Sequence, residues 1–349
     1  MTAAVTHRAG PADGSAPLPG PRGELSHALL RALRGPAGGP VPDPGAAAAR
    51  QADGWDEDLH LALHLCYEQH YRGFTGTDPE WEWDPGLLGL RRALEARFLD
   101  VLRVSATGPA DPWEALDALL VEPVDGSGVS HRLRDDGTRE QVREYAAQRS
   151  LYHLKEADPH AWVIPRLRGR AKAAFTAVEF DEFGGGRAER VHAELFAGLM
   201  RDLGLDASYG RYTDAAGPEM LAVVNMMSLF GLHRSLRGAL VGHFAHVETT
   251  SSPASRRLAA AMRRTGAGPA AEHFYDEHVT ADAVHEQVVR RDVVGGLLAD
   301  EPSLGRDVAF GVAATDAVEA RFGAAVLAAW DAGRSSLRVP LTPDAAPGA

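Results

Sequence analysis

The sequence predicts an all-α fold in which several helices form a bundle. Segments such as 59–71 and 87–104 place apolar residues at intervals of three and four, the period of a helix that buries one face. Runs of alternating β-branched residues, which are typical of half-buried strands, are nearly absent, and no Asn-Gly hairpin signal joins two such runs. We therefore expect a multi-helix bundle, and the sequence contains no internal repeat.

Changes in composition divide the chain into four parts. The N-terminal part contains 16 Pro or Gly and an alanine run without a sustained apolar period, which predicts disorder with at most a short helix near 25–33. A Gly- and Asp-rich stretch at 125–137 marks the next boundary. The expected parts are a disordered extension (1–53), an N-terminal helical subdomain (54–135), a main helical domain (136–337) and a tail (338–349).

The main domain is expected to consist of successive helices. Asp158 is a candidate N-cap and Pro159 suits the first turn of the helix that follows it. The helices predicted from the apolar period are 113–120 in the subdomain, then 138–157, 159–183, 187–203, 217–248, 253–265, 268–297 with room for an interruption, and 302–332.

Charge and cysteine content exclude several classes of protein. A formal net charge of −12 argues against a general nucleic-acid binder, because phosphate recognition needs clustered Lys and Arg. The single cysteine, Cys66, excludes an internal disulfide and a cysteine-based metal cluster. No run approaches the roughly 20 apolar residues of a membrane span, and the N-terminus lacks the pattern of a signal peptide. We expect a cytoplasmic protein without nucleic-acid or membrane partners.

One segment near the C-terminus places two imidazoles and a carboxylate on one helix face. His278, Asp282 and His285 fall within about 60° of one another at 100° per residue. Borderline metals such as Fe(II) accept this mixture of ligands. A solvated polar face would show the same spacing, so the triplet alone leaves both interpretations open.

A second candidate pair flanks three consecutive glycines. Glu182 and His192 would point about 80° apart on an ideal helix, but glycines allow local unwinding that can bring both to one site. Glu189 and His192 form an alternative Glu-x-x-His pair of the kind used by ferritin-like diiron bundles. A phosphate-binding glycine loop is a weaker interpretation, because no strand precedes it.

Two isolated acids complete the candidate set. Glu248 follows a long apolar segment and Glu156 precedes Pro159, although each alone is typical of an ordinary surface acid. Together, six ligands and a seventh carboxylate suit two irons that share a bridging carboxylate and leave positions open for dioxygen. A ferritin-like alternative leaves His278 without a role and uses Glu156, Glu189, His192, Glu248, Asp282 and His285.

Four motifs carry a resemblance to a known family. They are Cys66–Phe74 (CYEQHYRGF), Tyr152–Pro159 (YHLKEADP), Asp181–Gly186 (DEFGGG) and Glu277–Glu286 (EHVTADAVHE). With them the chain, from about residue 59 to 337, resembles the haem-oxygenase-like diiron oxidases and oxygenases, specifically the group called iron-containing redox enzymes. The resemblance implies a haem-oxygenase-like helical bundle preceded by an N-terminal helical subdomain. It implies these metal and catalytic residues: Glu182, His192, Glu248, His278, Asp282 and His285.

Within that family, the chain is most similar to the N-hydroxylating branch, which includes the N-hydroxylating domain of nitrosourea synthase. The branch has one additional upstream glutamate, which falls on Glu156. Because only a short polar tail follows Leu337, where that synthase has a cupin domain, we expect N-oxygenation without rearrangement to an N-nitroso product.

The resemblance implies a diiron oxygenase of natural-product biosynthesis that uses two Fe(II) ions, O₂ as co-substrate and an external electron donor. The expected substrate is a small amine, guanidine or aminoazole, and a homodimer is expected. The alternative is desaturation or oxidative C–C cleavage of an amino acid or fatty acid. A haem-binding or iron-storing protein is a third hypothesis, but a single axial histidine would leave the many acids unexplained.

Other polar groups receive simpler interpretations. His60 and His64 are one turn apart and are expected to lie on a polar face or at a dimer contact. His243 and His246 lie near Glu248 in sequence, so one of them is expected to orient a ligand. The basic pairs at 256–257 and 263–264 are expected to be solvated.

Overall fold

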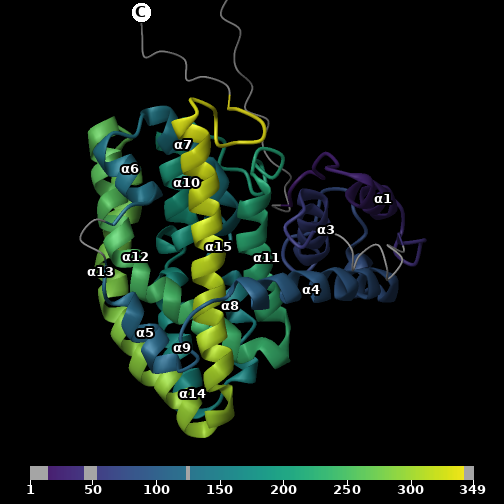
Figure 1. The fold of residues 1–349 in the computed structure, drawn as a ribbon. Helices are drawn as coiled ribbons and strands as arrows, with labels where there is room; N and C mark the ends of the chain where they lie inside the picture. The colour runs from purple at the N-terminus through teal and green to yellow at the C-terminus, as the bar shows by residue number, and fades with distance from the viewer. Residues whose placement is uncertain (1–14, 43–52, 123–125, 342–349) are drawn as a thin grey trace, which may run out of the picture.

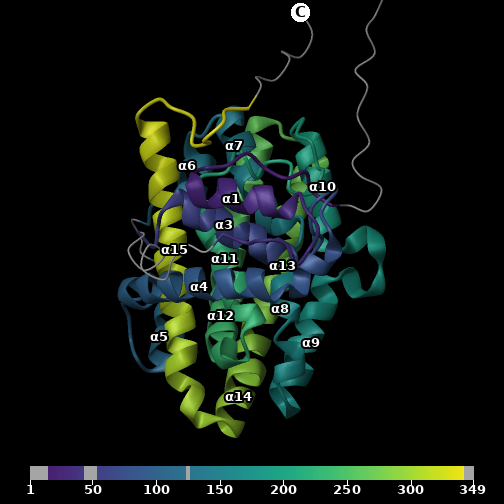
Figure 2. The ribbon, with the colours of Figure 1, turned by 90° about the vertical axis from the view of Figure 1, so that its right-hand side faces the viewer.

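The structure, a computed structural model, describes residues 15–42, 53–122 and 126–341. The predicted all-α fold is confirmed: across these ranges the chain forms helices and turns, and the only pairing of β type is an isolated bridge between Ala16 and Phe74. Figures 1 and 2 show a long helical bundle with a smaller N-terminal lobe against one side. No helix in the described ranges is both long and apolar enough to span a membrane.

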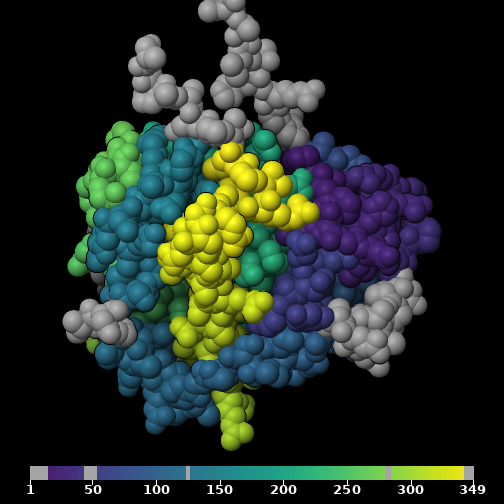
Figure 3. Space-filling model, turned by 45° about the horizontal axis from the view of Figure 1, so that its top comes forward, coloured from purple at the N-terminus to yellow at the C-terminus, as the bar shows by residue number. Residues whose placement is uncertain are grey.

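Within the described residues 15–42 and 53–122, the N-terminal lobe contributes three α-helices. They are α1 (Glu24–Leu33), α3 (Glu57–Glu68) and α4 (Pro85–Ser105), and the short 3₁₀ helix η1 (Pro79–Trp83) precedes α4. Helix α3 lies between α1 and α11 of the bundle, and α4 extends from the lobe to α15. In the space-filling view of Figure 3, the purple N-terminal lobe lies beside the yellow C-terminal segment.

The short helix predicted near 25–33 is present as α1, but the rest of residues 15–42 is ordered where disorder was predicted. Helix α1 buries Leu29, Leu30 and Leu33 completely or almost completely. Its first turn is capped by Asp58 of α3, whose carboxylate accepts hydrogen bonds of 2.8 Å from the backbone N–H groups of Leu25 and Ser26. Tertiary contacts therefore order a segment whose Pro and Gly content suggested disorder. The division of the chain into domains stays a prediction.

The bundle is built around two long helices, α12 and α15. Its α-helices are α5 (Pro112–Leu119), α6 (Val129–Asp135), α7 (Arg139–His153), α8 (Asp158–Ala161), α9 (Gly169–Glu182), α10 (His192–Asp202), α11 (Pro218–Leu232), α12 (Arg237–Thr265), α13 (Pro269–Val288), α14 (Gly295–Asp300) and α15 (Gly305–Asp331). Helix α12 contacts both α13 and α15 along its length. Side chains of α12, Glu248 among them, are therefore buried inside the bundle.

Glycines allow α12 and α15 to approach closely. A Cβ atom on Gly242 would lie 2.0 Å from the backbone oxygen of Val308, and one on Gly311 would lie 2.0 Å from that of Ala239. Such distances are far below van der Waals contact, so neither position accepts a side chain without movement of the backbone. The crossing fixes the depth of α12, and with it the position of Glu248, in the bundle.

The helix boundaries differ from those predicted in residues 217–265. The break lies at His233–Leu236, and α12 continues through Pro253. Arg166 donates hydrogen bonds to the carbonyl oxygens of Gly231 and Leu232, which ends α11 with its last carbonyls satisfied. The local breaking tendency of Pro253 is overridden by packing of α12 against its neighbours.

Two other boundaries also differ from those predicted, and one predicted interruption is present. The segment predicted as 159–183 is divided into α8, the 3₁₀ helix η2 (Ile164–Arg166) and α9, with Gly169 at a φ of 51° before α9 continues. Helix α10 begins at His192 rather than near residue 187. The interruption allowed in 268–297 is present as a π-helical turn, η6 (Val289–Val294).

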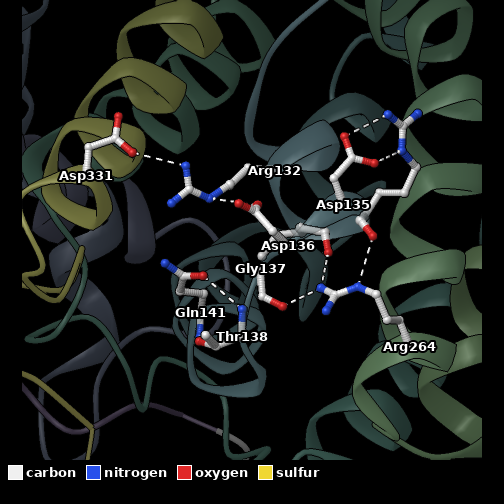
Figure 4. Close-up of polar contacts among 10 residues, drawn as sticks. Arg132, Asp135, Asp136, Gly137, Thr138, Gln141, Arg264 and Asp331 are labelled. Atoms are coloured by element: carbon white, nitrogen blue, oxygen red, sulfur yellow. Dashed lines mark hydrogen bonds and ion pairs between the residues drawn. The ribbon is translucent and has the colours of Figure 1, made fainter.

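The Gly- and Asp-rich boundary stretch contains helix α6, which is attached to α12. Figure 4 shows Arg264 of α12 at the C-terminal end of α6, where its guanidinium donates to the carbonyl oxygens of Leu133, Arg134 and Gly137. Arg132 reaches Asp331 of α15 at 3.1 Å. Arg264 is exposed, as expected, and it also caps the end of α6, whose last carbonyl oxygens lie beside it.

Candidate metal centre

The structure brings six of the seven predicted site residues into two adjacent groups. Each group contains three buried side chains whose ligand atoms lie within 4.8 Å of one another: Glu156, His192 and His278 in group A, and Glu182, Glu248 and His285 in group B. The seventh residue, Asp282, lies on α13, but its side chain is outside the described residues. The role of all seven as metal ligands stays a prediction.

A glycine turn brings Glu182 to His192. Gly184, Gly185 and Gly186 have φ values of 78°, 61° and 80°, a region that favours glycine, so the chain reverses between α9 and α10. Glu182 is the last residue of α9 and His192 the first of α10. Nδ1 of His192 lies 2.7 Å from Oε2 of Glu182. The unwinding predicted from the three glycines is therefore present.

The carboxylate of Glu182 contacts histidines of both groups. Its Oε2 lies 2.7 Å from Nδ1 of His192 in group A, and its Oε1 lies 3.7 Å from Nδ1 of His285 in group B. A carboxylate whose two oxygens face two separate sets of ligands has the geometry of a bridge between two metal ions. Two-metal sites hold their ions about 3.5–4 Å apart.

Helix α13 presents one histidine to each group. Nδ1 of His278 donates to the backbone oxygen of Phe274 at 2.7 Å, which leaves Nε2, 3.7 Å from Oε1 of Glu156, as the nitrogen with a lone pair. Nδ1 of His285 lies 3.2 Å from Oε2 of Glu248, on α12. The two turns of helix between these histidines separate the two groups.

Neighbouring carboxylates favour the protonated form of two imidazoles in the groups. Burial opposes protonation of His285, but the hydrogen bond and charge of Glu248 raise its pKa to about 9. Burial likewise opposes protonation of His192, and Glu182 raises its pKa above the usual value. Burial would raise the pKa of Glu156, but His153 holds it well below its usual range. A divalent cation can take the place of these protons, because metal binding releases protons from its ligands.

The donor set fits iron. Carboxylate and imidazole ligands suit Fe(II), and all six side chains are buried. Oε2 of Glu156 is buried and has no hydrogen-bond partner within the described part of the chain. A buried acceptor of this kind is costly unless a cation or donor satisfies it, and a metal ion in group A would do so.

Aromatic side chains close one side of group A. The ring of Phe274 lies 4.4 Å from that of His278 and 5.1 Å from that of Phe196, measured between ring centroids. His153 lies 4.7 Å from Phe196 by the same measure. These rings exclude water from the group and strengthen electrostatic interactions within it.

The structure corrects two predictions about other residues. Glu189 is exposed on the 3₁₀ helix η4 (Ala188–Arg190) and belongs to neither group, so the ferritin-like alternative has no support here. His60 and His64 are buried rather than on a polar face, and burial lowers their pKa values to about 3 and about 4. They are neutral core histidines, because α1 and α11 cover α3 on two sides.

The contacts of His243 lead through His160 to Glu179, three residues before Glu182, whereas the contact of His246 lies outside the two groups. His243 lies 2.9 Å from Oγ1 of Thr315 and 3.1 Å from Nε2 of His160, and His246 lies 3.8 Å from Asp316. The expectation that one of them orients a ligand stays a prediction.

Three polar residues beside the groups were not singled out from the sequence. Nδ1 of His153 lies 2.9 Å from Oε1 of Glu156, and Oδ2 of Asp181 lies 3.3 Å from Nε2 of His285. Glu179 is 1% exposed, and burial followed by the charges of Glu182 and Glu248 raises its pKa well above the usual value. His153 and Glu179 each precede a candidate ligand by three residues, a spacing that could have indicated them.

Comparison with known proteins gives two matches. The sequence profile described as "Iron-containing redox enzyme" matches residues 143–320, slightly more than half of the chain. A nitrosourea synthase from Streptomyces achromogenes subsp. streptozoticus is 25% identical over 216 residues, which cover 60% of this chain and 46% of the synthase. The chain thus matches less than half of that relative's length. The profile begins at α7 and ends in α15, so it includes every residue of both groups.

Proposed function

The chain belongs to the family of iron-containing redox enzymes, and from this premise we propose that it is a non-haem diiron oxygenase that oxidises the nitrogen of a small amine, guanidine or aminoazole. The observation that carries the diiron part is the carboxylate of Glu182, whose oxygens face His192 of group A and His285 of group B. Two ions bridged by one carboxylate are the arrangement that such a geometry supports best.

Each group would hold one iron. Glu156, His192 and His278 would bind the first, Glu248 and His285 with Asp282 would bind the second, and Glu182 would be shared. When bound, the irons supply the redox chemistry that activates O₂ for transfer of an oxygen atom to the substrate. N-hydroxylation of an amine consumes one O₂, two electrons and two protons and yields a hydroxylamine and water, so an external reductant is required.

The protein's own groups would orient the ligands and exclude water. The backbone oxygen of Phe274 fixes the ring of His278, and His153 holds Oε1 of Glu156. Phe196 and Phe274 keep bulk water from group A. Glu179 is a buried acid beside the site and can hold a proton there, because its pKa is raised by burial and by Glu182.

Two observations support nitrogen as the site of oxidation. Glu156 is a third buried glutamate in the two groups, in addition to Glu182 and Glu248, and the resemblance of its motif implies that it corresponds to the additional glutamate of the N-hydroxylating branch. The similar protein, nitrosourea synthase, is named for a product with an oxidised nitrogen. Desaturation or C–C cleavage of an amino acid or fatty acid is the alternative outcome that the test must separate.

The test begins with anaerobic titration of the apoprotein by Fe(II). We expect two irons per chain in the wild type and fewer in His278→Ala. A matched control is His273→Ala, which removes an exposed imidazole from the same helix and should still bind two. Stoichiometry below two in the wild type, or accumulation of many irons per chain, would contradict the diiron proposal.

Turnover under ¹⁸O₂ then identifies the reaction. The iron-loaded protein, with a chemical reductant and a panel of amines, guanidines and aminoazoles, should give products that carry ¹⁸O on nitrogen. Products that lose hydrogen or a carbon–carbon bond and gain no label would instead favour the alternative.

A further inference from the structure

Glu156 lies in an irregular turn whose backbone conformation needs support from surrounding contacts. The turn connects α7, which ends at His153, to α8, which begins at Asp158. Ala157 has a φ of 73°, a region that L side chains rarely adopt, and it is 1% exposed. Surrounding contacts must maintain a backbone of this kind. The contacts that reach the turn therefore decide where the carboxylate of Glu156 lies.

The strongest of these contacts is a buried ion pair between the turn and the N-terminal lobe. Lys155, which precedes Glu156, is 1% exposed, and its ammonium group contacts Oε1 of Glu68 at the end of α3. The hydroxyl of Tyr209 donates to the other oxygen of Glu68. The same ammonium group lies 4.2 Å from the centre of the Tyr71 ring. Lys155 is thus held by two groups of the lobe, Glu68 and Tyr71, and Tyr209 in turn holds Glu68.

A second, independent contact reaches the residue before Lys155. The guanidinium of Arg72 donates to the backbone oxygen of Leu154 at 3.2 Å, and it lies 4.4 Å from the centre of the Tyr209 ring. Arg72 therefore holds the turn by its backbone, at Leu154, while Glu68 holds it by the side chain of Lys155. Both belong to the segment Cys66–Phe74, a sequence motif that supplies no member of group A or group B.

We propose that Glu68 and Lys155 are positioning residues for the metal centre, and that the N-terminal lobe, through Glu68 and Arg72, holds the turn that presents Glu156 to group A. The proposal rests on the proposed diiron function. It assigns a role to the Cys66–Phe74 motif that metal ligation does not explain. It also makes a selective prediction, because the contacts reach group A through Glu156, whereas the members of group B come from α9, α12 and α13.

The selective effect is measured by anaerobic Fe(II) titration of the full chain, with calorimetry to resolve the two binding events. In Lys155→Met we expect one iron to bind as in the wild type and the other roughly 10- to 100-fold more weakly, the loss typical when a group that orients a ligand is removed. Glu68→Gln should show the same pattern.

Two further variants separate positioning from general damage. Lys155→Met leaves Glu68 buried without its cation, so the double variant Lys155→Met/Glu68→Gln removes that unpaired charge. The double variant should regain thermal stability and keep the weak iron site. Arg149→Met breaks an ion pair away from the turn, between α7 and Glu319 of α15 at 2.8 Å, and should bind both irons as the wild type does.

The outcomes are distinct. If Lys155→Met bound each of the two irons as tightly as the wild type does, the positioning role would be overturned. Full recovery of iron affinity in the double variant would also overturn it, and so would an equal loss of affinity in Arg149→Met. Either result would mean that the weaker iron binding comes from lower stability of the protein. A wild type that binds fewer than two irons would contradict the diiron function itself, before any variant is compared.

Discussion

The carboxylate of Glu182 lies 2.7 Å from the imidazole of His192 because the chain reverses between them. The reversal depends on Gly184 more than on its two neighbours. A Cβ atom on Gly184 would lie 2.7 Å from the backbone nitrogen of Val191, whereas the nearest atom to one on Gly185 is 3.9 Å away, in the Phe180 ring. Both glycines have a positive φ, so they differ mainly in the space around them.

We predict that Gly184→Ala destabilises the protein and impairs iron binding. The methyl group would push the backbone of residues 190–191 away, and His192 would move with it. Strain and overpacking of this kind cost about 1–3 kcal/mol each. Thermal unfolding of the apoprotein and Fe(II) titration measure the two effects.

Gly185→Ala is the matched control for this change. It introduces the same methyl group at a similar φ but makes only an ordinary contact with the Phe180 ring, so it should cost only the backbone strain of about 1 kcal/mol and retain both irons. Equal loss of iron in the two variants would show that the close approach at Gly184 does not set the distance between Glu182 and His192.

The sequence predicted the helical class and the turn at Gly184–Gly186 because both depend on local chemistry. Helical period follows from residues three and four apart, and consecutive glycines allow the chain to unwind wherever they occur. These local signals sufficed to suggest that Glu182 and His192 meet. They also placed His278 and His285 on one helix face, two turns apart.

The features that the sequence did not predict depend on burial and on contacts between distant parts of the chain. His60 and His64 could not be recognised as core residues, because the helix that covers them, α1, lies in a Pro- and Gly-rich segment. The break at His233–Leu236 depends on Arg166, which is distant in sequence and ends α11 by binding its carbonyl oxygens. The position of Glu156 likewise depends on Glu68 and Arg72, from another part of the chain.

We predict that Gly242→Ala strongly destabilises the fold. The added Cβ would lie 2.0 Å from the backbone oxygen of Val308, which cannot rotate away as a side chain can. Relief requires α12 and α15 to separate, at a cost of at least the 1–3 kcal/mol that is typical of overpacking. Chemical denaturation followed by circular dichroism measures the free energy of unfolding.

The control for Gly242→Ala is Gly89→Ala in α4. A Cβ there meets no atom within 4 Å, and the position is exposed. Alanine favours a helix interior over glycine by about 1 kcal/mol, so this variant should be slightly more stable than the wild type. Unchanged stability of Gly242→Ala would mean that the two helices can separate freely at their crossing.

The pKa of His285 leads to a prediction about the apoprotein. Its value in the folded protein is about 9, above the usual 6.5, because Glu248 stabilises the imidazolium against the opposing effect of burial. A raised pKa means that the folded state binds the proton more tightly than the unfolded state does. The resulting stabilisation is complete below pH 6.5 and is lost as the pH rises from 6.5 through about 9.

We therefore expect the unfolding free energy of the apoprotein to fall by about 1–3 kcal/mol between pH 6.5 and 9, given about 1.4 kcal/mol per pKa unit and some loss to solvent screening. The affinity for Fe(II) should rise over the same interval, because the metal must displace the proton of His285. Denaturation and Fe(II) titration at several pH values measure both trends. In His285→Gln the fall in stability should be smaller, since glutamine does not titrate; an equally steep fall in that variant would assign the pH dependence to other groups.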